Sequence, residues 1–131
     1  MKSVSGPYSL QKGALLDIWL SRPGGLRPHL RFPGAALVDS GSTVTWIHPR
    51  AATRLGLQVA GPTPVRQHHG SRLVPTYVCL LDLGDLGAFD WPVREINAAL
   101  TDFDLLLGRD LLMRWTTRLD GPRGIFEIIT S

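Results

Sequence analysis

The sequence has little cysteine and no long apolar run. These two absences argue against a disulfide-bonded secreted protein and against a protein that spans a membrane with helices. Cys79 is the only cysteine, so the chain cannot form an internal disulfide, which agrees with a reducing compartment. No window approaches the roughly 18 uninterrupted apolar residues that a membrane-spanning helix needs. Lys2 puts one positive charge near the N-terminus, but no apolar segment follows, so a secretory signal is not expected. We therefore predict a cytoplasmic protein without membrane contact.

Lysine is also scarce. Lys2 and Lys12 are the only lysines among 14 basic residues, so arginine supplies the rest, and the net charge is +3. The arginines are scattered along the chain, whereas nucleic-acid-binding proteins usually gather basic and aromatic residues on one surface. A small basic nucleic-acid-binding β domain is therefore poorly supported, and we predict no nucleic-acid partner.

Glycine and proline, in contrast, are abundant. The 131 residues include 14 glycines and 10 prolines, which separate many short apolar segments. This length fits one domain, and the contents of 44% hydrophobic and 19% charged residues are those of a globular protein. Short apolar segments between turn residues predict a mostly β fold with one or two short helices.

The turn residues also predict where the elements lie. Pro49 and Gly56 suit the two ends of a helix over residues 49–55, and a second helix is expected over 109–115. Pro33-Gly34 is expected to form a turn. A hairpin over 65–78 has its tip at residues 68–71, and a closing hairpin covers 118–129. The remaining strands are predicted over 14–20, 26–32, 35–38, 44–47, 77–83, 89–96 and 103–107.

Two short motifs carry the chemistry. The first is an aspartate directly after a buried strand, in Ala36-Leu37-Val38-Asp39-Ser40-Gly41-Ser42. The second is Leu105-Leu106-Leu107-Gly108-Arg109-Asp110, ahead of a short helix. An isolated Asp-Ser-Gly is a common turn, but here it follows an apolar strand and precedes both a hairpin and the second motif. In its motifs and order of elements, nearly the whole chain resembles the retropepsin-like aspartic peptidases.

The resemblance implies a fold, an assembly and a reaction. It implies a closed acid-protease barrel over residues 13–131, preceded by an N-terminal extension of residues 1–12. It also implies a two-fold homodimer that hydrolyses an extended peptide, with Asp39 as the catalytic residue and no metal or organic cofactor.

Chemistry explains why one such aspartate is not enough. Hydrolysis without a metal or a covalent intermediate needs a base that activates water and an acid that protonates the carbonyl oxygen. Two carboxylates a few ångströms apart share one proton because both cannot ionise at once, so one is the base and the other the acid. The chain has a single Asp-Ser/Thr-Gly triplet. A second copy must therefore supply the other carboxylate, with both Asp39 residues at the two-fold axis.

The neighbours of Asp39 have expected roles. Gly41 lets the backbone turn tightly around the carboxylate. By resemblance, Ser40 hydrogen-bonds across the dimer, Gly108 lets the second motif pass close beneath the catalytic loop, and the hairpin tip is a flap that closes over substrate. The substrate-binding residues predicted on the floor and flap are Ser42, Thr43, His68, His69, Gly70 and Ser71.

The chain departs from the viral members of this family at one charged position. They often carry an acidic residue where Thr43 stands, and that acid pairs with the arginine of the second motif. Arg109 lacks this partner, so Asp110 or another acid is expected to replace it. Alternatively, Asp110 only caps the following helix.

Other polar residues have simpler interpretations. Adjacent His68 and His69 point to opposite faces of a strand, and no third ligand stands at metal-binding spacing, so an exposed turn is favoured over a metal site. Cys79 lies within a strand and is expected to be a buried structural residue rather than a nucleophile. Asp102 and Asp104 look like turn and cap residues. The four dispersed tryptophans are assigned to packing.

A second function remains open at this point. A non-catalytic peptide-binding or dimerisation module could keep the same fold. In that case an Asp39→Asn variant would bind peptides and behave like the parent protein.

Overall fold

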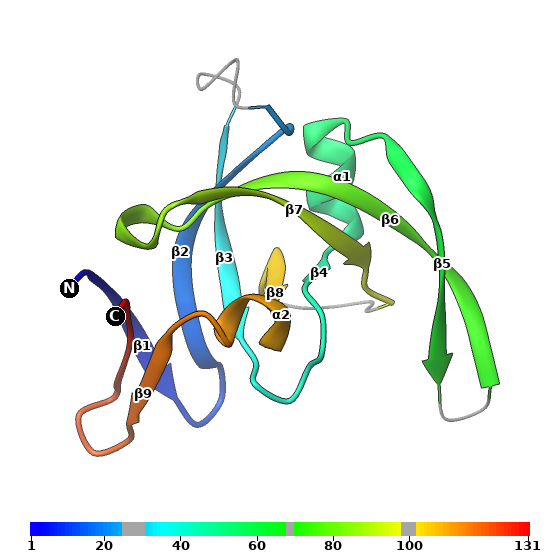
Figure 1. The fold of residues 1–131 in the computed structure, drawn as a ribbon. Coiled ribbons are helices and arrows are strands. Elements are labelled where there is room, and N and C mark those ends of the chain that lie inside the picture. Colours follow the sequence, from blue (N-terminus) through cyan, green and yellow to red (C-terminus); the bar gives the residue numbers. More distant parts are fainter. Residues whose placement is uncertain (25–30, 68–69, 98–101) are drawn as a thin grey trace.

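The computed structural model describes residues 1–24, 31–67, 70–97 and 102–131 (Figure 1). It confirms the mostly β architecture, with two short α-helices, α1 (Pro49–Leu55) and α2 (Arg109–Leu112), and one 3-10 turn, η2 (Gly84–Leu86). The strands are β1 (Ser3–Ser9), β2 (Gly13–Ser21), β3 (Phe32–Val38), β4 (Trp46–Ile47), β5 (Val59–Gln67), β6 (Gly70–Asp82), β7 (Ala88–Glu95), β8 (Leu105–Leu107), β9 (Thr116–Asp120) and β10 (Ile125–Ile129).

The strands form one mixed sheet, and part of it closes on itself. Its order is β5-β6-β7-β4-β8-β3-β2-β1-β10-β9, and β6 also pairs with β2. This extra pairing closes β2, β3, β8, β4, β7 and β6 into a barrel (Figure 1). Most neighbouring strands are antiparallel, but β4 runs parallel to β7, and β3 runs parallel to β8. That parallel pair brings the two sequence motifs side by side.

Alternating apolar side chains fill the barrel, as the period of two in a strand requires. On β2, the inward residues Leu16, Ile18 and Leu20 are at most 3% exposed. The short strand β8 is buried at all three positions, because the barrel covers both of its faces. Among the described residues, no helix is long and apolar enough to cross a membrane.

The turn predicted at Pro33-Gly34 is wrong. Both residues lie inside β3, where Pro33 pairs with Trp19 and Gly34 with Ile18. Glycine suits this position because the side chains of Leu20 and Asp104 pack close to its backbone. A Cβ atom at Gly34 would lie 3.2 Å from Leu20 Cδ1 and 3.3 Å from Asp104 Oδ2. Tertiary packing thus overrides the local turn preference. Of the strand predicted over 26–32, residues 26–30 lie outside the described part of the chain.

The predicted hairpin over 65–78 is present, but it is longer. β5 and β6 pair from Val59 with Tyr77 to Gln67 with Gly70. The strand predicted separately over 77–83 is the continuation of β6. Of the predicted tip, His68 and His69 lie outside the described residues.

The helices begin where the sequence predicts. Pro49 opens α1, and Gly56 ends it in the left-handed conformation, with φ 64°. α2 also begins as predicted at Arg109, but it ends at Leu112 rather than at Trp115.

The two ends of the chain lie side by side (Figure 1). β1 pairs with β10 from Ser3 with Ile129 to Pro7 with Ile125, and it also pairs with the start of β2. Beyond these strands, the amide of Lys2 donates to Thr130 Oγ1 at 2.8 Å. Most of the predicted N-terminal extension therefore forms a strand of the sheet.

Candidate functional site

Asp39 stands directly after β3, where the two motifs meet. Its backbone N–H donates to the carbonyl oxygen of Leu107 at 3.0 Å, which extends the pairing of Val38 with Leu107. The side chain is half-buried, and its Oδ1 accepts the N–H of Gly41 at 2.9 Å. A Cβ at Gly41 would lie 3.0 Å from the same oxygen, which explains glycine at this position. Among the described residues, no donor contacts Oδ2 of Asp39.

The second motif holds the loop that follows Asp39. Arg109 donates its backbone N–H to Ser42 O at 2.8 Å and its Nη1 to Ser40 O at 3.0 Å. Gly108 lies directly against the backbone of Val44, and a Cβ at Gly108 would overlap the Val44 carbonyl. The close approach expected at Gly108 is therefore present.

Arg109 contacts the loop that follows Asp39 through the carbonyl oxygen of Ser40, and not through the acid expected in place of the missing partner at Thr43. The carboxylate of Asp110 instead contacts Thr45 and Trp91. Its Oδ1 accepts the hydroxyl of Thr45 at 2.8 Å, and its Oδ2 accepts Trp91 Nε1 at 2.9 Å and Thr45 N at 3.2 Å. Oδ1 also accepts the adjacent N–H of Leu111 at 3.0 Å, but Asp110 lies inside α2, whose N-cap is Gly108 without a side-chain cap hydrogen bond, so the helix-cap interpretation is wrong. Asp110 joins the loop, α2 and β7.

Buried Thr45 completes this network, because its hydroxyl oxygen also accepts the N–H of Gly108 at 3.2 Å. Sequence reasoning missed Thr45 and the polar role of Trp91. The only signal was a threonine within an apolar strand, which needs a partner once buried.

The four residues after Asp39 differ in exposure. Ser40, Gly41 and Thr43 are exposed, whereas Ser42 is half-buried. The Ser42 hydroxyl donates to Val44 O at 2.7 Å and accepts Trp46 Nε1 at 3.0 Å. Ser42 thus shapes the loop through its side chain, while Ser40 and Thr43 face outward.

The β5–β6 hairpin extends toward the same end of the molecule as the loop that follows β3 (Figure 1). Gly70 and Ser71 begin β6, opposite Gln67 and Arg66 of β5. A cavity of about 410 Å³ lies elsewhere, lined by Arg22, Pro23, residues 56–60 and Val78. Asp39 is not part of that cavity.

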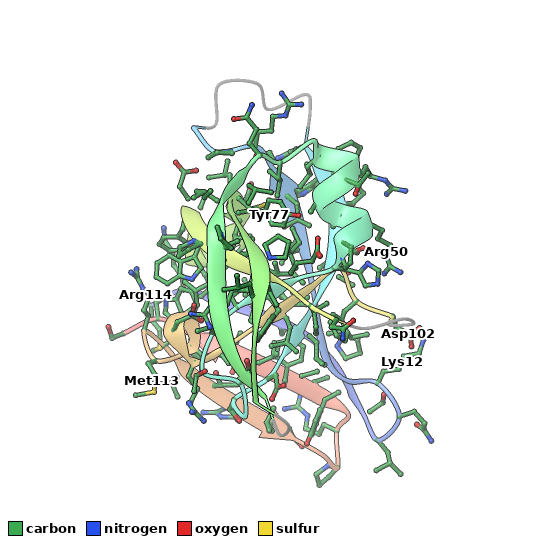
Figure 2. All side chains as sticks on the ribbon, turned by 90° about the vertical axis from the view of Figure 1, so that its right-hand side faces the viewer. Lys12, Arg50, Tyr77, Asp102, Met113 and Arg114 are labelled. Atoms are coloured by element: carbon green, nitrogen blue, oxygen red, sulfur yellow. The ribbon has the colours of Figure 1, made fainter. Side chains whose placement is uncertain are left out.

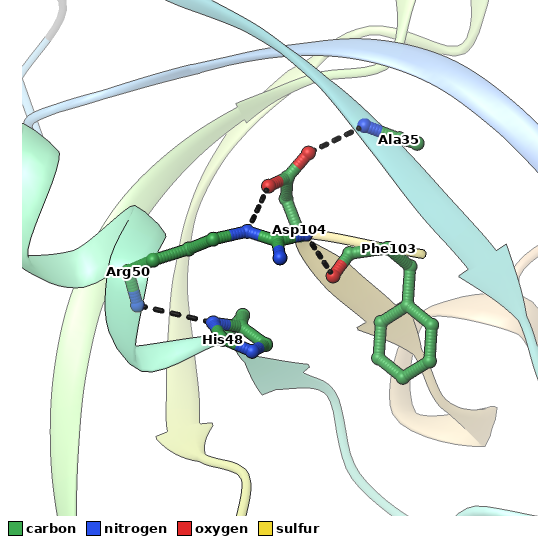
Figure 3. A network of polar contacts seen from close by, with 5 residues as sticks. All are labelled: Ala35, His48, Arg50, Phe103 and Asp104. Atoms are coloured by element: carbon green, nitrogen blue, oxygen red, sulfur yellow. Dashed lines mark hydrogen bonds and ion pairs between the residues drawn. The ribbon is translucent and has the colours of Figure 1, made fainter. Parts of the chain in front are cut away.

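A second polar network lies beside the N-terminus of α1 (Figure 3). Asp104, interpreted from sequence as a cap, binds Ala35 N through Oδ2 at 3.0 Å and Arg50 Nε through Oδ1 at 3.2 Å. His48 Nδ1 accepts Arg50 N at 3.1 Å and so caps α1. Among the described residues, the buried Nε2 of His48 has no hydrogen-bond partner. Burial, and then the Arg50 cation, lower the pKa of His48.

Burial raises the pKa values of two further groups, Cys79 and Tyr77. Burial raises the pKa of Cys79 to about 12, which agrees with a structural rather than a nucleophilic cysteine. Tyr77 lies in the barrel (Figure 2), where burial and its hydrogen bond to Glu95, 2.9 Å long, raise its pKa to about 12.

Comparisons with known proteins agree with this geometry. A family model described as aspartyl protease matches residues 31–111. No curated protein matches the chain in sequence.

Two solved structures share the fold. The crystal structure of a retropepsin-like aspartic protease from Rickettsia conorii aligns with a TM-score of 0.64 at 15% identity, over 97% of this chain and 90% of that one. The retroviral protease-like domain of Ddi1 from Leishmania major aligns with a TM-score of 0.52 at 20% identity, over 90% of this chain and 94% of that one. They confirm the retropepsin-like fold. Because the family model covers more than half of the sequence, including both motifs, the chain belongs to the aspartyl protease family.

Proposed function

We propose that the chain is an aspartic endopeptidase whose active site forms between two copies, each contributing Asp39. The observation that carries the proposal is the Asp39 carboxylate itself. Its Oδ1 is oriented by Gly41 N–H at 2.9 Å, and the backbone behind it is fixed to Leu107. One chain supplies one such carboxylate, whereas acid–base hydrolysis of this kind uses a pair.

In the proposed reaction, the two carboxylates share one proton and titrate as a unit. The ionised Asp39 removes a proton from water as the water oxygen attacks the peptide carbonyl carbon. The protonated Asp39 gives its proton to the carbonyl oxygen, and a neutral tetrahedral diol forms. Proton transfer to the amide nitrogen then breaks the C–N bond, and an amine and a carboxylic acid leave.

The surrounding residues are proposed to hold this pair in place. Arg109 fixes the loop on either side of Gly41 through the carbonyls of Ser40 and Ser42. The exposed Ser40 side chain is free to meet its counterpart across the two-fold axis. Gly108 allows the motif to pass beneath the loop without a side chain in between. Preorganisation of this kind lowers the cost of aligning the reacting groups.

We propose that the substrate is an extended peptide, bound as an added strand between the loop and the β5–β6 flap. Ser42 and Thr43 would form the floor, and His68, His69, Gly70 and Ser71 the flap. Apolar groove walls would favour hydrophobic side chains beside the cleaved bond.

The test compares the parent with Asp39→Asn on a diverse peptide library, read by mass spectrometry at several pH values. Asp102→Asn is the matched control, since Asp102 is an exposed aspartate outside the site. We expect cleavage by the parent and the control, inhibition by pepstatin-type compounds, and a loss of about 10²–10⁴-fold or more in Asp39→Asn. If a parent sample proven to be dimeric leaves every peptide intact, the peptidase proposal is refuted, and peptide binding unchanged in Asp39→Asn supports the non-catalytic module.

A further inference from the structure

One face of the sheet carries Asp39 and a row of side chains from five neighbouring strands. Leu37 lies two residues before Asp39, and residues two apart along a strand point to the same face. Strand by strand from β3 to β6, the pairings place on this face Leu37, Leu106, Trp46, Arg94 and Thr76. On the opposite face, the residues next to them are fully buried: Ala36, Leu105, Ile47 and Val93. The row therefore starts beside Asp39 and ends on β6, which continues into the β5–β6 hairpin (Figure 1).

Trp46 connects this row to the loop that follows Asp39. Its Nε1 donates to Ser42 Oγ at 3.0 Å, and on the next strand it pairs with Arg94. The backbone N–H of Arg94 donates to Thr45 O at 3.2 Å. Strands in a sheet lie about 4.8 Å apart, so β7 is about 14 Å from β3, which is the length of about four residues of extended peptide. A substrate strand that crosses the row from Asp39 would therefore pass Arg94 within about four residues of the cleaved bond.

Arg94 is a half-buried cation without a counter-ion among the described residues. None of the four ion pairs in that part of the chain includes it, and its guanidinium donates no hydrogen bond there. The adjacent acid, Glu95, lies on the other face and accepts the hydroxyl of Tyr77 at 2.9 Å. Because a charge removed from water is costly unless it is paired, a guanidinium in this position favours an acidic ligand.

We propose that Arg94 binds an acidic side chain of the substrate, so that the enzyme prefers peptides with aspartate or glutamate within about four residues of the cleaved bond. The inference rests on the proposed function, because it concerns the peptide that the Asp39 pair would cleave. A guanidinium offers two parallel N–H groups to one carboxylate, and such charge-assisted pairs are stronger than neutral hydrogen bonds. Each copy contributes one Arg94, so the two-fold symmetry places an acidic site on both sides of the cleaved bond.

The negative charge of the Asp39 pair does not oppose this preference. At physiological ionic strength the Debye length is about 8 Å, so the interaction between charges about 14 Å apart is largely screened. Between the two charges, the row carries the apolar side chains of Leu106 and Trp46. The same face thus combines an apolar segment next to the cleaved bond with a cationic site farther along the peptide.

Matched peptides test the preference. Starting from a peptide that the parent cleaves, a series places one glutamate or one glutamine at each position up to four residues from the bond. Values of kcat/KM are measured at about pH 6, where a peptide glutamate is ionised. For at least one position, we expect the parent to cleave the glutamate peptide about tenfold or more faster than the glutamine peptide, and high salt should reduce this ratio. A ratio near one at every position would refute the inference.

Substitution of Arg94 shows whether its guanidinium causes the preference. Arg94→Gln should bring the ratio close to one, and Arg94→Glu should reverse it, so that a peptide with lysine at this position is cleaved faster than the glutamate peptide. Arg123→Gln is the matched control and should keep the parent ratio, since Arg123 lies in the turn between β9 and β10 with a side chain 74% exposed. A purely structural role of Arg94 would slow the cleavage of both peptides alike, and that unchanged ratio would refute the inference. Thermal unfolding measures how much of each variant is folded.

Peptide binding separates a failure of this inference from a failure of the proposed function. Fluorescence anisotropy of labelled library peptides with Asp39→Asn measures the preference without hydrolysis. A glutamate preference in binding that Arg94→Gln abolishes, together with a dimeric parent that cleaves nothing, would support the acidic site and refute the peptidase. Cleavage by the parent without any glutamate preference would support the peptidase and refute the acidic site. If no peptide is bound or cleaved, both are refuted.

Discussion

Gly108→Ala tests how the second motif holds the loop that follows Asp39. Gly108 has φ −93°, a conformation open to any residue, so the substitution introduces no backbone strain of its own. The effect of the substitution comes only from steric overlap with neighbouring atoms. The new methyl group would overlap the carbonyl of Val44, and the nearest atoms are all backbone atoms that cannot rotate away as a flexible side chain can.

The magnitude follows from this geometry. An extra methyl group in a well-packed interior costs about 1–3 kcal/mol, and the upper end applies where the neighbours are backbone atoms. A loss of about 3 kcal/mol lowers the melting temperature of a chain of this size by about 10–15 °C. The loop must also move away from Leu107 and Arg109, so cleavage by any remaining folded protein should fall as well.

Gly121→Ala is the matched control, because no atom lies within 4 Å of a Cβ built there and the residue has no positive φ. We expect its unfolding free energy to stay within about 0.5 kcal/mol of the parent. The assay is urea and thermal unfolding followed by circular dichroism, with peptide cleavage measured in parallel. If Gly108→Ala is as stable and active as Gly121→Ala, the loop is not held by this close approach.

Two further predictions concern the polar networks. Asp110→Ala should destabilise the fold by about 2–3 kcal/mol, because Thr45 and Trp91 lose a charged acceptor, whereas Asp110→Asn keeps one acceptor oxygen and should lose less; equal losses in urea unfolding would contradict this. His48 has a lowered pKa when folded, so its contribution is present above the unfolded value of 6.5 and is lost as the pH falls below 6.5. Protonation at Nδ1 removes the acceptor for Arg50 N, a helix cap worth about 1 kcal/mol. His48→Asn should therefore lose less stability at acid pH than the parent. Identical profiles of unfolding free energy against pH would refute this role of His48.

Local patterns predicted those features whose cause is local. α1 was identified because Pro49 and Gly56 each restrict the chain at their own position. The position of Asp39 after a buried strand followed from the apolar run before it. The turn predicted at Pro33-Gly34 is wrong for the same reason, because the sequence offers only a local turn preference there. The strand there depends on pairing with β2, which no short window contains.

The contacts that hold the site are non-local, and for that reason the sequence could not predict them. Asp110 meets Trp91 only because β7, β4 and β8 are consecutive in the sheet. The strand order was not fixed by the sequence pattern. The expectation for Arg109 failed for a related reason. An arginine needs acceptors, but a backbone carbonyl such as Ser40 O serves as well as a carboxylate, and sequence does not show which one is near.

The contacts that form the Asp39 loop are distinct from the second carboxylate that the proposed reaction needs. Among the described residues, Leu107, Arg109 and the Asp110 network of the same chain contact the Asp39 loop. Ser40 is exposed, and no donor among the described residues contacts Oδ2 of Asp39, so both groups can meet another partner. A single copy can therefore hold a formed loop without a complete carboxylate pair. On the proposed mechanism, assembly rather than folding switches on hydrolysis, so the dissociation constant of the dimer sets the concentration at which the enzyme becomes active.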